Sequence, residues 1–151
     1  MPDGDKVAHI SFSARDNDQR AEWFTRVRGF SVFDEVAGAD WRGVLLLYAG
    51  SGTVIQFQQF DQDQGKEFDP RRTGLDHIGL KAGSPDVLKQ WQEHFEALNI
   101  DYTPIADRDH GPGFALRDPD GHQFEMFYRA DHPLAGRTAD RPVLRGRDRS
   151  T

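Results

Sequence analysis

The chain repeats itself at a spacing of about seventy residues, and this repeat constrains its fold more than any other feature. The aligned pairs are residues 7–12 with 75–80, 43–46 with 113–116, and 52–57 with 121–126. Self-similarity at a fixed spacing indicates duplicated structural units, so the chain is predicted to be a tandem duplication. Its size fits a single domain over residues 5–130. That domain divides into module one at about 5–59, a polar linker at 60–74 and module two at about 75–130.

Each module is predicted to have the order strand, helix, then three strands. An alternating apolar pattern opens each half, at 7–13 and at 75–81, and this pattern is typical of a half-buried strand. Helical spacing follows in each half, and then three short runs separated by turns. The predicted fold class is α+β, with two βαβββ modules whose mixed sheets form a curved trough.

Both helices have recognisable ends. Ser84 is the predicted N-cap of the second helix, and Asp16 or Asn17 caps the first, because short polar side chains accept hydrogen bonds from free backbone N–H groups. Gly29 and Asn99 tolerate the left-handed conformation that ends a helix. The first helix is therefore predicted to begin after Asp16 or Asn17 and to end at Gly29, and the second to begin after Ser84 and to end at Asn99.

Composition excludes several classes of function. The chain has no cysteine and a formal net charge of −6, which argues against disulfides, thiolate metal sites and a nucleic-acid groove. No apolar run is long enough to span a bilayer, and the N-terminal residues lack the pattern of a secretion signal. We expect a cytoplasmic protein without membrane or nucleic-acid partners, and an arginine-rich tail at 131–151 that is disordered.

Strand alternation selects four residues as candidate metal ligands. Neighbouring side chains of a strand point to opposite faces. In the four repeat-related strands the bulky apolar residues take one face, which a helix is expected to cover. The opposite face carries His9, Gln56, His77 and Glu125 at equivalent positions of the two modules. Imidazole and carboxylate groups suit a divalent transition metal, and the sequence leaves Zn, Ni, Co, Mn and Fe open.

Further residues are predicted to line a substrate pocket. Ser11 and Gln58 share the face of the candidate ligands, while Arg108 and His110 lie in the loop before a late strand of module two. Loops commonly carry binding residues. By the same alternation, Asp76 points away from His77, so no contact between their side chains is expected.

These stretches resemble one known superfamily. The relevant segments are residues 9–12, 53–57, 74–80 and 114–126, the last with the sequence FALRDPDGHQFEM. Together they are similar to the vicinal oxygen chelate superfamily, which includes glyoxalases, bleomycin resistance proteins and extradiol dioxygenases. The resemblance covers about residues 5–130 and does not select one reaction.

The resemblance implies a metal-dependent enzyme acting on a small oxygenated substrate. Its ligands would be His9, Gln56, His77 and Glu125, with Glu125 also catalytic, and the reaction would be of the isomerase, lyase or dioxygenase type. Two adjacent substrate oxygens would bind the metal, which would stabilise an enolate or oxyanion. The alternative is a protein that binds an antibiotic or another natural product without turnover. A homodimer is expected by analogy with the superfamily.

Overall fold

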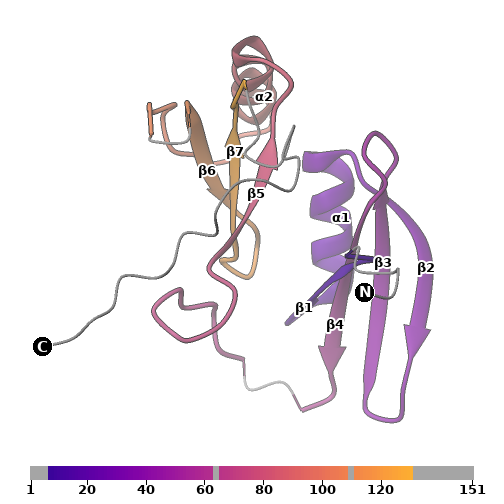
Figure 1. The fold of residues 1–151 in the computed structure, drawn as a ribbon. Helices are drawn as coiled ribbons and strands as arrows, with labels where there is room; N and C mark the ends of the chain where they lie inside the picture. The colour runs from indigo at the N-terminus through magenta and orange to yellow at the C-terminus, as the bar shows by residue number, and fades with distance from the viewer. Residues whose placement is uncertain (1–6, 63–64, 109–110, 131–151) are drawn as a thin grey trace, which may run out of the picture.

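A computed structural model describes residues 7–62, 65–108 and 111–130 of the chain. Figure 1 shows the helices and strands in chain order. They are β1 (Ile10–Ser13), α1 (Asn17–Arg28), β2 (Ser31–Ala37), β3 (Trp41–Tyr48), β4 (Thr53–Phe60), β5 (His77–Lys81), α2 (Pro85–Ala97), β6 (Gly113–Arg117) and β7 (Gln123–Phe127). Neither helix in the described part of the chain has the length and apolar character needed to cross a membrane.

The two modules form two mixed sheets, which confirms the predicted fold class. Module one has the strand order β1-β4-β3-β2, and module two has the order β5-β7-β6. In each sheet the first strand runs parallel to the last strand of its module, β1 with β4 and β5 with β7. The equivalent pairing shows that the sequence repeat is also a structural repeat.

Module two departs from the prediction in one strand. The segment after α2 makes only two isolated bridges to β6, through Tyr102 and Ala106. Pro104 lies between them, and proline has no N–H to donate to a strand partner. The third strand of this module is therefore reduced to single contacts, and its sheet has three regular strands where four were expected.

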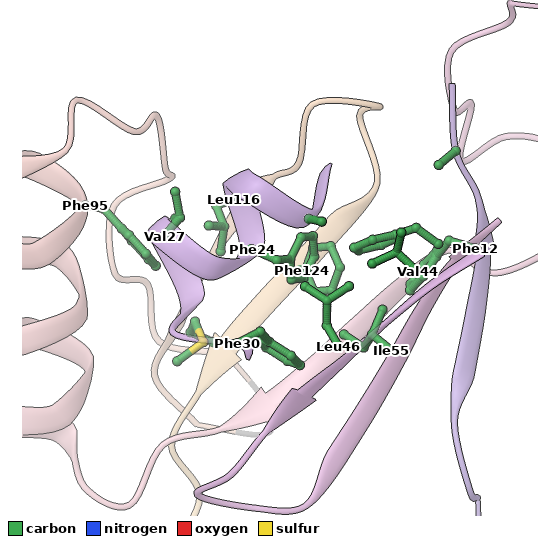
Figure 2. Close-up of a cluster of buried hydrophobic side chains, with 14 of the residues drawn as sticks. Phe12, Phe24, Val27, Phe30, Val44, Leu46, Ile55, Phe95, Leu116 and Phe124 are labelled. Atoms are coloured by element: carbon green, nitrogen blue, oxygen red, sulfur yellow. The ribbon is translucent and has the colours of Figure 1, made fainter. Parts of the chain in front are cut away.

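Helix α1 lies between the two sheets (Figure 1). The Phe24 ring on α1 is 4.9 Å from the Phe57 ring of β4 and 5.2 Å from the Phe124 ring of β7, measured between centroids. Figure 2 shows Phe24 and Phe124 within a cluster of buried apolar side chains, to which Phe57 also belongs. The same cluster includes Phe95 of α2. Burying them all removes apolar surface from water, which is the main force holding the modules together.

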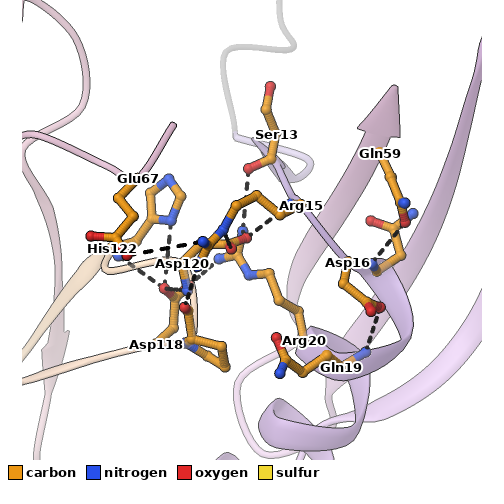
Figure 3. Close-up of polar contacts among 12 residues, drawn as sticks. Ser13, Arg15, Asp16, Gln19, Arg20, Gln59, Glu67, Asp118, Asp120 and His122 are labelled. Atoms are coloured by element: carbon orange, nitrogen blue, oxygen red, sulfur yellow. Dashed lines mark hydrogen bonds and ion pairs between the residues drawn. The ribbon is translucent and has the colours of Figure 1, made fainter. Parts of the chain in front are cut away.

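Ion pairs also join the modules at one end of α1 (Figure 3). The guanidinium of Arg20 is fully buried and pairs with Asp118, in the turn between β6 and β7. Its second partner is Asp120, at 3.4 Å, and Asp120 also accepts a 2.6 Å hydrogen bond from Arg15. Burial lowers the pKa of Arg20, and the two carboxylates oppose that effect. The turn of module two is thus fixed to the first helix.

The helix ends agree with the sequence. The Asp16 side chain accepts hydrogen bonds from two N–H groups of α1, and Gly29 ends that helix at φ +70°. The Ser84 side chain caps α2 through the N–H of Val87. Asn99, just after α2, has φ +53°. These caps set where each helix starts and stops, and so fix where the strands that follow begin.

Candidate metal and substrate site

Gln56 and Glu125 lie on the sheet faces that point away from α1. In β4, Ile55 and Phe57 belong to the apolar core, so Gln56 between them lies on the opposite face. In β7, Phe124 and Met126 belong to the core, so Glu125 lies on the opposite face. The expected separation of apolar and ligand faces is therefore present in both sheets.

His77 and Glu125 meet on the open face of module two. The His77 Nε2 atom is 3.7 Å from the Glu125 Oε2 atom. The imidazole is 40% exposed, whereas the Glu125 side chain is only 7% exposed. The carboxylate is thus held in a protected position, and the imidazole faces solvent.

Asp76 fixes the other side of the His77 ring. Its Oδ2 atom is 2.6 Å from His77 Nδ1. The expectation that these side chains do not touch was wrong, because Asp76 precedes β5 and alternation does not govern a residue outside the regular strand. A carboxylate beside Nδ1 favours the tautomer that carries its proton on Nδ1, and in that tautomer the lone pair of Nε2 can bind a cation.

Arg108 reaches the same carboxylate from the loop before β6. Its Nη1 atom is 2.9 Å from Glu125 Oε1, and its side chain is 39% exposed. The two oxygens of Glu125 thus face different groups, one toward Arg108 and one toward His77. Arg108 was predicted to bind substrate; the structure places it beside Glu125, and its role in substrate binding stays a prediction. His110, predicted for the same loop, lies outside the described residues.

Module one contributes a separate polar face. Ser11 on β1 is the register partner of Gln56, and the Gln56 Nε2 atom donates a 3.3 Å hydrogen bond to Gln58 Oε1. His9 is exposed and directly precedes β1. Ser11, Gln56 and Gln58 therefore share one face of the sheet, as predicted.

The structure does not bring the four predicted ligands together within one chain. Because α1 separates the sheets, the open face with Gln56 and the open face with Glu125 point in opposite directions. Within residues 7–62, 65–108 and 111–130, no group of three or more His, Asp or Glu side chains is placed to hold a metal ion. One chain thus presents two separate groups of candidate ligands, called half-sites below. They are His9 with Gln56 on module one and His77 with Glu125 on module two. The assignment of the four ligands stays a prediction.

The half-site on module two nevertheless fits a divalent metal. Two atoms bound to one ion at ~2.0–2.2 Å each lie at most about 4.4 Å apart, so the separation of His77 Nε2 from Glu125 Oε2 is compatible with a shared ion. A carboxylate on the other ring nitrogen, as Asp76 provides, is a usual partner of a metal-binding histidine.

The buried arginine at the module junction was missed by the sequence analysis. Arg20 falls at helical spacing before Phe24, on the inward face of α1. A charged residue within the apolar stripe of a helix requires a buried partner. The two aspartates of the Asp118–Gly121 turn were the natural candidates, but they were interpreted only as turn residues.

The fold and the half-sites define a duplicated βαβββ protein, and comparisons with known proteins assign its family. The family model described as Glyoxalase/Bleomycin resistance protein/Dioxygenase superfamily matches residues 6–126. The chain belongs to this superfamily, as the resemblance indicated.

One curated relative matches this chain at low sequence identity. Metapyrocatechase from Geobacillus stearothermophilus is 24% identical over 129 residues, which cover 84% of this chain and 36% of that protein. The chain therefore spans about a third of that relative's length.

Two solved structures share the fold. The glyoxylase/bleomycin resistance protein/dioxygenase domain from Frankia sp. EAN1pec has a TM-score of 0.75 and 25% identity, covering 82% of this chain and 97% of that chain. The fosfomycin resistance protein FosX from Listeria monocytogenes, solved with Mn(II) and 1S,2S-dihydroxypropylphosphonic acid, has a TM-score of 0.60 and 18% identity. It covers 84% of this chain and 93% of that chain.

Proposed function

We propose that the chain is a metal-dependent enzyme that acts on a small, oxygen-rich and anionic substrate, by isomerase, lyase or dioxygenase chemistry. The observation that carries the proposal is the pairing of His77 with Glu125 on an open sheet face, with Asp76 orienting the imidazole. The FosX structure contains Mn(II), which supports the proposal that this fold can hold a divalent metal.

Each residue of the half-site has a distinct role in this proposal. His77 and Glu125 hold the metal, and Asp76 keeps the His77 proton on Nδ1. Arg108 supplies a positive charge beside the carboxylate, which favours a substrate with its own negative charge. When bound, a divalent ion would polarise adjacent substrate oxygens and stabilise the negative charge that develops on them.

Glu125 is also the proposed proton acceptor, through its Oε2 atom when that oxygen is released from the metal. Its side chain is 7% exposed, and Arg108 holds its Oε1 atom at 2.9 Å, which leaves Oε2 directed to the metal side of the site. Asp76 is more exposed, at 63%, and is engaged by the imidazole. Of these two carboxylates, Glu125 is therefore the one protected from water, where proton transfer is most readily controlled.

A second copy of the chain would complete the site. His9 and Gln56 lie on the far side of α1 from Glu125, so these ligands reach one metal only if they come from the partner subunit. The open face of module one also carries half-buried apolar residues on β3, namely Trp41, Leu45 and Leu47. A partner chain on this face would remove them from water. The proposed assembly is a homodimer with two equivalent sites.

Metal analysis tests this proposal directly. The full chain is purified without chelator and its metal content is measured beside His77→Ala and Glu125→Ala. The wild-type protein should hold about one divalent ion per chain, and both variants should lose it. Gln59→Ala, on β4 outside the proposed ligand set, is the matched control and should retain the metal. Metal retained in both ligand variants would overturn the assignment.

The binding alternative has a distinct signature. A protein that sequesters a natural product without turnover would bind its aromatic ligand equally well after metal removal and return it unaltered. The enzyme proposal expects the opposite result. Chelator should abolish turnover of thiol hemiacetals, acyl-CoA epimers or catechols, assayed with and without oxygen, and added metal should restore it.

A further inference from the structure

A cavity of about 400 Å³ lies at the junction of the modules. It opens between the last turn of α1, the end of β3 and one side of α2. Its lining includes Arg26, Arg28, Tyr48, Gln90, Trp91 and His94. Two of these residues are arginines, and none of the residues that line it in the described part of the chain is an aspartate or glutamate.

Arg28 is a buried cation whose charge is not balanced by any carboxylate in the described part of the chain. It is 5% exposed, and it forms no ion pair with a carboxylate among the described residues. Its Nη1 atom contacts the sulfur of Met126 at 3.0 Å, and its guanidinium carbon lies 4.7 Å from the centre of the Trp91 ring. Its Nε atom is buried and has no hydrogen-bond partner. Loss of hydration lowers the pKa of Arg28 to about 10.

This arrangement is unusual for an arginine. Buried charges are normally paired, because removing an ion from water is costly unless an opposite charge replaces the water. Sulfur is a weak acceptor and an aromatic ring offers only partial compensation. Arg20, the other buried arginine of α1, has two aspartate partners. At Arg28 the corresponding anion is not supplied by the described part of the chain.

We propose that this cavity binds a small organic anion, whose carboxylate or phosphate group pairs with Arg28 and whose flat body packs against Tyr48 and Trp91. The exposed Arg26 adds a second positive charge at the rim. A guanidinium presents paired N–H donors that match the oxygens of either group. The size of the cavity suits a single-ring compound rather than a macromolecule.

The cavity is separate from the proposed metal site. Arg28 contacts Met126, whose side chain points to the core side of β7, whereas Glu125 points to the open side of the same strand. The sheet of module two therefore lies between the two sites. Binding at one is expected to occur without occupation of the other.

Isothermal titration of the full chain tests the proposal with three probes of similar shape. Phenyl phosphate and benzoate carry the two candidate anionic groups, and benzyl alcohol is the neutral control. At least one anion should bind the wild-type protein at one site per chain, and benzyl alcohol should not. The stronger of the two anions identifies the preferred group. Failure of both anions to bind at millimolar concentration would overturn the proposal.

Variants locate the binding. Arg28→Met keeps the length and apolar stem of the side chain and should weaken the anion at least tenfold, as expected for loss of a charge-assisted hydrogen bond. Arg72→Gln, in the exposed linker, should leave affinity unchanged. His77→Ala should also leave it unchanged, which separates this site from the proposed metal site. Equal affinity in Arg28→Met, or loss of binding in His77→Ala, would contradict the proposal.

A second measurement does not depend on the buried variant folding. Arg26 is exposed, so Arg26→Gln is expected to fold normally and should weaken binding of the anion relative to the wild-type protein. In the wild-type protein, the Nε–H signal of Arg28 in a nitrogen-15 spectrum should shift in proportion to occupancy. An Nε–H signal that stays in place while the anion binds would place the anion elsewhere.

Discussion

Arg20 shows how one residue can determine the relation of two modules. It lies on α1 of module one, and its charge is balanced by aspartates in a turn of module two. Its guanidinium also lies 4.0 Å from the centre of the Phe57 ring. Removing one member of such a buried group leaves the other charges unpaired in the core.

Arg20→Ala is therefore expected to destabilise the protein by about 3–5 kcal/mol, the usual cost of breaking a buried ion pair. Urea unfolding, followed by circular dichroism, measures the change in free energy of unfolding. Arg42→Ala is the matched control, because Arg42 pairs with Asp18 at the surface, where the two side chains are 50% and 74% exposed. Exposed pairs contribute about 1 kcal/mol or less. Similar losses in the two variants would contradict the structural importance of the buried group.

At the scale of single residues, the sequence predicts faces better than contacts. Alternation correctly separated Gln56 and Glu125 from the apolar core. It failed for Asp76, which lies before its strand, and it gave no information on the Arg108 contact, because a loop has no fixed periodicity. Pairing across the chain, as between Arg20 and Asp118, depends on how the modules pack, which local patterns do not specify.

Helix α1 depends on its C-terminal glycine. Gly29 adopts φ +70°, a conformation that side chains with a Cβ atom rarely take. A Cβ added there would be 3.9 Å from the Tyr48 ring, so no steric clash adds to the backbone strain.

Gly29→Ala should lower the free energy of unfolding by about 1 kcal/mol, through strain alone. Thermal unfolding measures this as a lower Tm. Gly83→Ala is the matched control, because Gly83 is not at positive φ and a Cβ added to it meets no atom within 4 Å. An equal fall in Tm for the two variants would show that the left-handed turn does not limit the stability of α1.

At the scale of elements, module one has the predicted order and helix ends. The prediction is possible there because caps and alternation are local signals. The third strand of module two was expected and is reduced to two bridges at Tyr102 and Ala106. Pro104 was visible in the sequence, but the repeat with module one favoured a full strand. The prediction followed the repeat, whereas the proline was the more informative guide to this strand.

At the scale of the whole molecule, candidate ligands at equivalent positions of the repeat, such as Gln56 and Glu125, lie on different sides of α1. Strand alternation correctly placed Gln56 and Glu125 on the faces opposite the apolar core. The sequence did not reveal that α1 would lie between the sheets, because the packing of one module on another depends on surfaces formed only after each has folded. Under the proposed function, a second chain completes the trough predicted from the repeat.

Mixing two defective variants tests this two-chain site. In a heterodimer of His9→Ala and His77→Ala, one site receives intact His9 from one subunit and intact His77 and Glu125 from the other. With a different affinity tag on each chain, the purified heterodimer should bind about one metal ion, and each homodimer none.

A site built within one chain predicts no recovery of metal in the heterodimer. The matched control combines His77→Ala with Glu125→Ala. Both ligands lie on module two, so each composite site of this heterodimer lacks one of them and should stay empty. Recovery in the control pair, or none in the test pair, would contradict the two-chain site.

Phe24 packs on Phe57 of module one and on Phe124 of module two, so the two modules share one hydrophobic contact surface. Cleavage of the backbone between β4 and β5 would not release the halves as independent bodies, since each fragment alone would expose the surface that the other covers. A protease cut there is expected to yield a nicked protein that migrates as an intact particle in native conditions and divides only in denaturant. The two modules are thus held together more by their packing on α1 than by the linker between β4 and β5.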